Sequence, residues 1–474
     1  MSLAVAPSLP QPGFFGSVNT PARFTVYVAL GQILLLSLLV HLDLIVFFPL
    51  LLIGAMLLYI SAKNLFVWIP LAILGHSVLF LQKTGQVTLT EVGFGVFFYG
   101  ILLIWLARHF FIERNEISIV YGDWWLVAFI CIGLLSIIPA LMFSNNLFLW
   151  LREYLVFMGL LFYFPLREAM KGEKGRKILL STFLVLALII ALRNIWEYKS
   201  RIALAAYVWE LLGGRQGVHE SLFMVMIIVG AAVWMFHASP RIRLTALAGV
   251  SFFSVALVMT FSRGYWVATL IGLAVLLWLG NQIERRRLLG ISALVTVSSL
   301  VVLMIGFSDV FVDLVSTIVQ RFSTAVSATE DRSFANRLVE SAKVWELIQA
   351  NPFVGYGLGA KFSYHHLLYG YAFEDSYIHN GYLYIWHKLG LPGLVVFLVA
   401  FLTKIVRGVK LSRIIESPIR PWVLAATTTL LVMLLLSFTS PQFYSRDSVL
   451  IICLCWATIE SCMSERKGGD TMSR

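Results

Sequence analysis

Hydrophobic positions occur along this chain in long uninterrupted windows. A membrane-spanning helix needs roughly 20 mainly apolar residues, and about 14 windows of that length follow one another along the sequence. They are residues 23–42, 43–62, 66–82, 90–111, 123–143, 148–166, 178–198, 221–238, 243–261, 265–281, 288–307, 381–406, 422–439 and 448–463. The pattern predicts an all-α, polytopic integral membrane protein with about 12–14 transmembrane helices.

The composition agrees with a membrane protein. Of the 474 residues, 59% are hydrophobic and 13% are charged, whereas a soluble domain carries about a quarter charged residues. The net charge of +11 does not indicate nucleic acid, because the basic residues separate apolar windows instead of forming a patch. Membrane lipids with anionic headgroups are the expected partners. The four cysteines lie in or beside apolar windows without the paired spacing of a metal site.

The basic residues orient the predicted spans. Clusters at 167–177, 241–243, 285–287 and 404–420 all fall in even-numbered connections, and another follows the last span. Because short cytoplasmic loops are enriched in Lys and Arg, both termini are expected in the cytoplasm. The predicted divisions are a cytoplasmic tail at 1–22, transmembrane helices at 23–307, a large periplasmic loop at 308–380, three further helices at 381–463, and a cytoplasmic tail at 464–474.

The 308–380 loop is expected to contain amphipathic helices. Phe334, Leu338, Trp345 and Ile348 recur at helical spacing and predict a helix from about 334 to 349, which Asn351-Pro352 ends. The glycine-rich run at 355–359 is interpreted as a turn. It is not interpreted as a phosphate-binding loop, because no strand precedes it.

Basic residues on the face away from the cytoplasm need another explanation, and binding an anion is a common one. Arg215, Arg263 and Arg337 fall on that face. An ionisable residue at membrane depth is a functional candidate, and two guanidinium groups suit a pyrophosphate because each binds phosphate oxygens through a planar fork. Two simpler interpretations remain open: Arg263 snorkels to the interface, or Arg337 forms a surface ion pair with Glu340.

His379 opens the span at 381–406. A helix N-terminus favours the neutral imidazole, which is the form that accepts a proton as a general base. A structural role is the alternative, and His365, His366 and His387 are weaker rivals. A metal site built from His365, His366 and Asp375 is also conceivable, although no metal is expected.

Two further polar groups lie beside apolar windows. Glu220 follows the glycine-rich stretch around Arg215, where small residues let the backbone approach a ligand closely. Arg446 and Asp447 are interpreted as a simple ion pair near the last span.

Three ordered motifs resemble the O-antigen ligase and polymerase superfamily. They are Ser262-Arg263-Gly264 after a span, Arg337…Trp345…Asn351-Pro352-Phe-Val-Gly355-Tyr-Gly357 in the long loop, and His379-Asn380-Gly-Tyr-Leu…Gly390-Leu-Pro-Gly393-Leu at the next span. Together they cover roughly residues 205–400.

The resemblance implies a GT-C-like inverting glycosyltransferase in the bacterial inner membrane, with its active site on the periplasmic face. Its donor would be a glycan on undecaprenyl pyrophosphate, without a metal or nucleotide-sugar cofactor. By similarity, Arg263, Arg337 and Arg215 would hold the pyrophosphate and His379 would act as the base. Glu220, Asn380 and Tyr377 are candidate contacts to donor or acceptor. Where relatives carry Asn after the arginine, this chain has His219-Glu220.

The acceptor stays open at the level of sequence. A polymerase would extend another lipid-linked repeat, and a ligase would transfer the glycan to lipid A-core or to a protein. The extra early spans favour a polymerase, with a chain-length regulator as a possible partner. A lipid-glycan flippase is the alternative from another class, but such transporters usually have two related halves.

Overall fold

The computed structural model describes residues 56, 89–109, 119–120, 122–202, 211, 219–236, 239–326, 332–367, 370–414 and 419–472. Contacts divide the chain into residues 1–63 and residues 64–474, and the following concerns the second unit. Its helices are α4 (Leu89–Ala107), α5 (Asp123–Leu135), α6 (Ile137–Met142), α7 (Leu147–Met158), η3 (Gly159–Phe162), α8 (Tyr163–Ala169), α9 (Glu173–Ile202), α11 (Glu220–Phe236), α12 (Pro240–Val258), α13 (Arg263–Leu279), α14 (Gln282–Gly306), η4 (Ser308–Val310), α15 (Phe311–Val326), α16 (Arg332–Ala350), α17 (Gly381–Ile414), α18 (Arg420–Leu436) and α19 (Arg446–Met472).

The all-α membrane architecture is confirmed. Within the described residues, seven helices are long and apolar enough to cross a membrane. The predicted spans from 123–143 onward all coincide with helices, and α11, α13 and α18 are shorter apolar helices at three of them. The spans predicted at 23–42, 43–62 and 66–82 lie outside the described residues, so the total of 12–14 stays a prediction.

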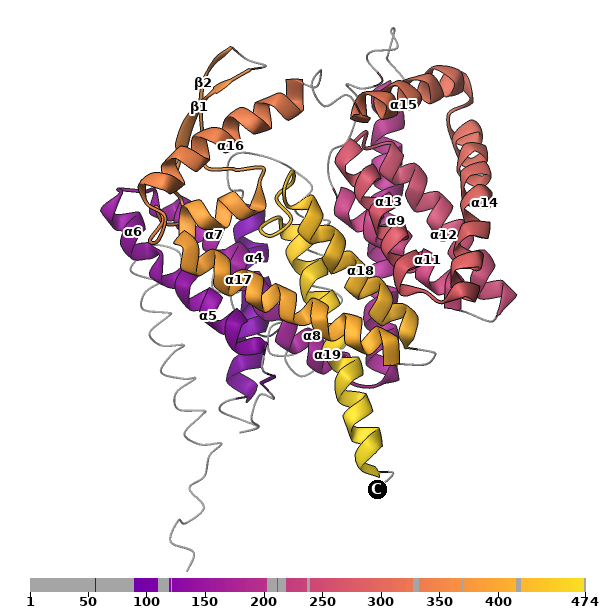
Figure 1. Ribbon diagram of the computed structural model, residues 1–474, viewed down its shortest axis with the longest axis horizontal. Helices are drawn as coiled ribbons and strands as arrows, with labels where there is room; N and C mark the ends of the chain where they lie inside the picture. Colours follow the sequence, from indigo (N-terminus) through magenta and orange to yellow (C-terminus); the bar gives the residue numbers. More distant parts are fainter. Residues whose placement is uncertain are drawn as a thin grey trace, which may run out of the picture. The chain divides into compact units, whose positions relative to one another are not determined.

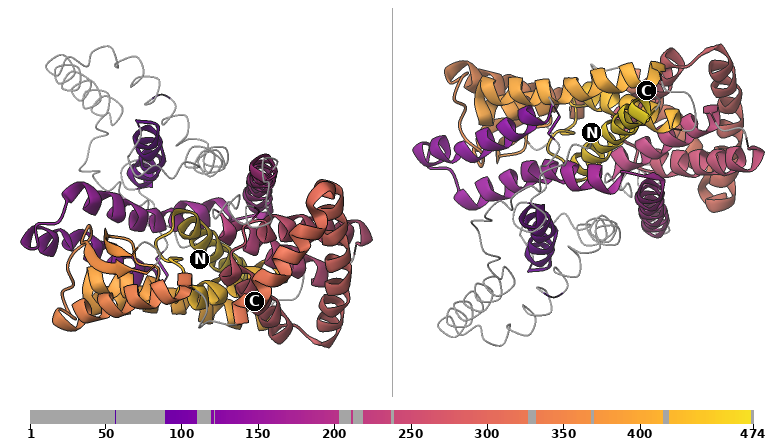
Figure 2. Two further views of the ribbon diagram at one scale, coloured as in Figure 1. Left: turned by 90° about the horizontal axis from the view of Figure 1, so that it is seen from above. Right: turned by 90° about the horizontal axis from the view of Figure 1, so that it is seen from below.

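Helices from distant parts of the sequence pack together. α11 lies against α12, α13 and α18, while α18 also contacts α17 and α19. α5 runs alongside α17 (Figures 1 and 2), so the early and late parts of the described chain share one packed unit. This packing brings the starts of α11, α13, α17 and α19 to the same end as the end of α18.

The 308–380 loop contains the expected helices α15 and α16. It also forms an antiparallel hairpin that was not predicted, with β1 (Phe362–His366) paired to β2 (Tyr371–Asp375). α16 packs on β1 and on α17 (Figure 1). The loop is therefore a folded cover on the helices.

Only part of the apolar stripe lies on the buried face of α16, where Ile348 is 1% exposed. Leu338 and Trp345 are 56% and 42% exposed, whereas Asn336 and Glu340 are 5% and 0% exposed. The buried side is therefore half polar. The helix predicted at about 334–349 is confirmed, and in a membrane protein the apolar side chains of such a helix can face outward.

α17 is two helical pieces joined at a kink. Gly390 adopts φ 68° and ψ 179°, where the left-handed region favours glycine. Pro392 has no N–H, so it cannot donate to the carbonyl of Lys388 as the next helical turn requires. Gly357 N–H donates to that carbonyl instead, at 2.9 Å. The turn after α16 thus fills the break in α17.

The glycine-rich run at 355–359 is a turn, as predicted, and it is tightly packed. Gly355, Gly357 and Gly359 all have positive φ. A Cβ on Gly357 would lie 2.5 Å from the backbone nitrogen of Ala140, which no side chain tolerates. The glycines are required because this turn touches α6 and α17 through its backbone.

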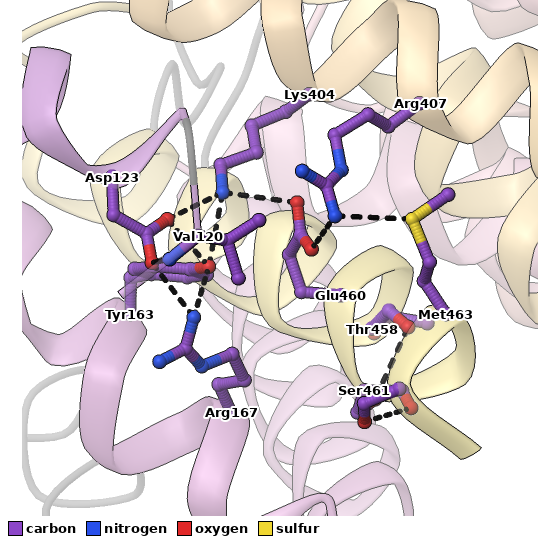
Figure 3. A network of polar contacts seen from close by, with 11 residues as sticks. Val120, Asp123, Tyr163, Arg167, Lys404, Arg407, Thr458, Glu460, Ser461 and Met463 are labelled. Atoms are coloured by element: carbon purple, nitrogen blue, oxygen red, sulfur yellow. Dashed lines mark hydrogen bonds and ion pairs between the residues drawn. The ribbon is translucent and has the colours of Figure 1, made fainter. Parts of the chain in front are cut away.

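A buried ionic cluster links α5, α8, α17 and α19 (Figure 3). Lys404 Nζ lies 2.7 Å from Asp123 Oδ1 and 3.0 Å from Glu460 Oε1. Arg167 contacts the other oxygen of Asp123 at 2.7 Å, and Arg407 contacts Glu460 Oε2 at 2.7 Å. Each buried carboxylate therefore has two cationic partners.

This cluster changes how some of the basic residues are interpreted. Arg167, Lys404 and Arg407 were counted among loop residues that mark the cytoplasmic side, yet they lie in α8 and α17 as partners of carboxylates. Their position is explained by charge neutralisation inside the protein. The orientation therefore depends on the remaining basic residues, such as Lys171, Lys174 and Lys177, which are exposed.

Candidate active site

His379 lies two residues before α17 and is held by Glu340 of α16. Its backbone N–H donates to Glu340 Oε1 at 2.6 Å, and its ring Nδ1 lies 2.7 Å from Glu340 Oε2. Glu340 is fully buried, whereas 30% of the His379 side chain is exposed. Because an ionised carboxylate only accepts hydrogen bonds, the proton of a neutral His379 ring lies on Nδ1 and leaves Nε2 as an acceptor.

Asn380 caps α17. Its side-chain oxygen accepts hydrogen bonds from the backbone N–H groups of Tyr382 and Leu383, at 3.0 and 3.1 Å. This is the usual task of Asn at a helix start. The capping role explains Asn380 without a ligand, and it sets the direction in which the chain leaves His379.

Arg337 lies one turn before Glu340 on α16, but the two do not pair in the manner considered from sequence. The guanidinium Nη1 of Arg337 donates to the backbone carbonyl of Thr439 at 2.7 Å, while Glu340 binds His379. Thr439 belongs to the connection between α18 and α19, which comprises residues 437–445 and is called the 437–445 segment below.

The 437–445 segment also holds the chain around His379. The N–H of Gly381 donates to the carbonyl of Ser437 at 2.8 Å, and the N–H of Ile378 donates to the hydroxyl of Tyr444 at 3.1 Å. The Tyr444 hydroxyl in turn donates to the carbonyl of Ile378. The residues on both sides of His379 are therefore fixed to the same segment that receives Arg337.

Arg263 is the first residue of α13 and is partly buried. Next to it, the hydroxyl of Ser262 donates to Glu220 Oε1 at 2.8 Å. Two residues later, the hydroxyl of Tyr265 lies 3.1 Å from Ser440 Oγ and accepts from Gln442 Nε2 at 2.7 Å. The first turn of α13 is thus attached to the 437–445 segment, which connects it to the elements that carry Arg337 and His379.

Tyr377 lies between these groups. Its ring meets the His379 ring edge-on with centroids 4.9 Å apart. Desolvation raises the pKa of the Tyr377 phenol, the nearby Tyr265 and Glu340 raise it further, and Arg337 lowers it. The phenol therefore senses side chains of both α13 and α16, as expected where these elements approach one another.

Glu220 and its neighbour His219 form a second polar group at the start of α11. His219 Nδ1 contacts Asp447 Oδ2, and His219 is only 8% exposed. The ion pair of Asp447 with Arg446 stays a prediction, because the side chain of Arg446 is outside the described residues. Burial by itself lowers the pKa of His219, but the charge and hydrogen bond of Asp447, with a contribution from Glu220, raise it overall.

Other sequence candidates lie elsewhere. Arg215 is outside the described residues. His387 is 1% exposed and stacks on Tyr356, with ring centroids 5.0 Å apart, so it is a packing residue. His365 and His366 are consecutive in β1 and therefore point to opposite faces of the hairpin. They do not converge with Asp375, and no group of three metal-ligating side chains occurs among the described residues.

The sequence interpretation missed Glu340 as a partner of His379 and missed the 437–445 segment. Glu340 was considered only as a surface partner of Arg337, three residues away. The sequence signal for Glu340 was its position four residues after Asn336, which puts two polar side chains on one face of the helix. In the structure the side-chain oxygen of Asn336 accepts a hydrogen bond from the N–H of Leu367 at 3.0 Å. Polar residues four apart on one helix face can mark a buried polar side as well as a solvated one.

Comparison with known proteins adds one finding. No curated protein matches the chain. Residues 247–398 match the sequence profile of a family described as O-antigen ligase. The matched stretch begins in α12 and ends in α17, so it contains Arg263, Arg337, Glu340 and His379. Over this stretch, less than half of its length, the chain is similar to O-antigen ligases.

Proposed function

We propose that this protein is an inverting membrane glycosyltransferase that transfers a glycan from undecaprenyl pyrophosphate to an acceptor hydroxyl during surface polysaccharide assembly. The family match supports the general class, and the observation that carries the proposal is the arrangement around His379. A partly exposed histidine is held by a buried carboxylate, and the helices that carry Arg337 and Arg263 are attached to the segment beside it.

The proposed chemistry is a single displacement at the anomeric carbon. The bond between that carbon and the pyrophosphate oxygen breaks while a bond to the acceptor oxygen forms on the opposite face. The acceptor hydroxyl gives its proton to Nε2 of His379, which acts as general base. The undecaprenyl pyrophosphate leaves with the bonding electron pair.

In this proposal Arg337 and Arg263 stabilise the leaving group. Negative charge grows on the pyrophosphate as the bond breaks, and positioned cations aimed at such charge are usually the largest catalytic contribution. Both guanidinium groups start from structured elements, α16 and the first turn of α13, so little reorganisation is needed. Arg215 is proposed as a further donor contact by family resemblance alone.

The test is glycosidic bond formation by the purified protein with a lipid-linked donor and acceptor. We expect Arg263→Ala and Arg337→Ala each to lose about 3–4 kcal/mol of transition-state stabilisation, roughly a hundred- to a thousandfold in rate. His379→Ala should be nearly inactive. The matched control is Lys361→Ala, which removes an exposed cation of the same loop that pairs with Glu374 on the hairpin. Normal rates in all three variants would defeat the proposal, and movement of labelled lipid without bond formation would favour a flippase.

The acceptor decides between a polymerase and a ligase. We favour a polymerase, as the length of the chain suggests. Gel patterns of surface glycan in a deletion strain separate the two, because loss of a polymerase leaves single repeats attached while loss of a ligase leaves polymer on the carrier lipid. The proposed location is the bacterial inner membrane with the 308–380 loop outside the cytoplasm, which reporter fusions within that loop test.

A further inference from the structure

We propose that Glu340 is a positioning residue that fixes the tautomer and the orientation of His379. This inference rests on the proposed function, since it concerns the same proton transfer. Within the described residues, Glu340 is the residue whose side chain lies within hydrogen-bonding distance of the His379 ring. Glu340 is not one of the residues named in the three motifs. Nothing in the family match assigns it a role.

The first argument is geometric. Both carboxylate oxygens of Glu340 are used on one residue: Oε1 accepts from the backbone N–H of His379 at 2.6 Å, and Oε2 accepts from ring Nδ1 at 2.7 Å. Two contacts from one planar carboxylate fix both the chain and the ring. The imidazole therefore has little freedom to rotate.

The second argument is burial. Glu340 is 0% exposed while the His379 side chain is 30% exposed. Burying a carboxylate is costly unless it is hydrogen-bonded or paired. The hydrogen-bonding partner of this buried carboxylate is the ring of His379 and not the side chain of a lysine or an arginine. A buried acid behind a partly exposed imidazole is the arrangement that keeps a general base in its working tautomer and stabilises the imidazolium that it becomes.

The third argument concerns the helix that carries Glu340. Arg337 lies three residues earlier on α16, so the two side chains are neighbours on the helix surface. Arg337 is attached to the 437–445 segment and Glu340 to His379. One rigid element therefore sets the distance between the proposed pyrophosphate contact and the proposed base.

The proton balance of the step is unchanged by this role. The acceptor O–H bond breaks and an Nε2–H bond forms, while the Nδ1–H bond stays intact. Glu340 neither gains nor loses a proton in the step and touches neither substrate nor leaving group. Its contribution is made entirely through His379.

The decisive variant is Glu340→Gln in the full-length protein. Its amide oxygen still accepts from the backbone N–H, so the fold is retained, but its NH2 group donates to Nδ1 and favours the tautomer with the proton on Nε2. We expect kcat to fall by roughly a thousandfold or more with KM for the donor little changed, by analogy with acid-to-amide changes behind a catalytic histidine. Glu346→Gln is the matched control, since it lies on the same helix as an exposed partner of Lys343, and it should retain full activity.

A double variant separates positioning from general damage. If Glu340 acts only through His379, then Glu340→Gln combined with His379→Ala is no slower than His379→Ala alone. Losses that multiply would overturn the inference. Should the Gln variant fail to fold, the unsubstituted protein carries the test: ¹⁵N NMR of histidine-labelled protein, assigned by difference with His379→Ala, is expected to place the proton on Nδ1, and a proton on Nε2 would contradict it.

The two proposals fail in distinguishable ways. Full activity of Glu340→Gln beside an inactive His379→Ala removes the positioning role and leaves the function intact. Normal rates in His379→Ala, Arg263→Ala and Arg337→Ala alike remove the proposed function itself.

Discussion

At the scale of single residues, the histidines have different tasks because their partners differ. His379 is partly exposed with Glu340 behind it, His219 is buried against Asp447, and His387 is stacked inside the packed helices on Tyr356. Of these three, only His379 has a partly exposed side chain. The neighbours of each imidazole, and not its position in the sequence, decide which one is a candidate base.

The His219–Asp447 pair predicts a pH dependence of stability. The pKa of His219 is raised above its ordinary value of 6.5 in the folded protein. A raised pKa means that the folded state binds the proton more tightly, so this stabilisation is complete below about pH 6.5 and is lost as the pH rises through the folded value. Thermal unfolding in detergent between pH 6 and pH 9 should therefore show a falling Tm that is flatter for Asp447→Asn. Parallel curves for the two proteins would contradict the prediction.

At the scale of elements, α16, the turn after it and α17 are interlocked. The turn supplies Gly357 N–H to the break in α17, and the N–H of Gly359 donates to Glu153 Oε2 of α7 at 2.8 Å. Glu153 also binds Lys388 of α17, with Nζ 2.7 Å from Oε2. One carboxylate thus joins the turn, α7 and the first piece of α17, which is the piece that begins beside His379.

Removing that carboxylate should loosen all three elements. Lys388 is 0% exposed, and breaking a buried ion pair leaves an unpaired charge at a cost of about 3–5 kcal/mol. We expect Glu153→Ala to lower the melting temperature in detergent markedly, and Glu153→Leu with Lys388→Met to restore much of it. Glu173→Ala, which breaks the exposed pair with Lys177, is the control and should have little effect. An unchanged Tm in Glu153→Ala would show that the pair does not stabilise the interlock.

At the scale of the whole described unit, two polar clusters lie toward opposite ends of α17. His379 precedes its start, and Lys404 lies 25 residues further on, in the helical piece beyond the kink at Gly390. The first cluster leaves an imidazole partly exposed. In the second (Figure 3), Asp123 and Glu460 are both buried with all of their cationic partners in place. The first is suited to chemistry and the second to holding helices together.

The second cluster should therefore matter for folding more than for catalysis. Lys404→Met removes the cation shared by Asp123 and Glu460, and we expect a loss of stability of about 3–5 kcal/mol. The activity of the protein that remains folded should be close to normal. Lys410→Met on the same helix is exposed and serves as the control. Equal melting temperatures for the two variants, measured in the same detergent, would disprove the role of the cluster.

Much of the architecture was predictable from the sequence. The helices from α5 onward, the helix at 332–350 and the turn with three glycines follow from local composition, because a window of apolar residues or a positive φ is a property of the segment itself. The three motifs also indicated the similarity to O-antigen ligases that the profile match shows over residues 247–398. The assignment of His379 as a base and of the arginines as phosphate contacts stays a prediction.

The partners of the polar side chains were decided by the tertiary structure alone. The pairing of Glu340 with His379, of Asp447 with His219 and of Lys404 with two carboxylates joins residues from 39 to 281 positions apart. The insertion of the turn into the break at Gly390 is of the same kind. An apolar window predicts a membrane helix because insertion into the bilayer depends on the side chains of that window alone. The partner of a buried charge depends instead on which side chains the packed helices bring within hydrogen-bonding distance.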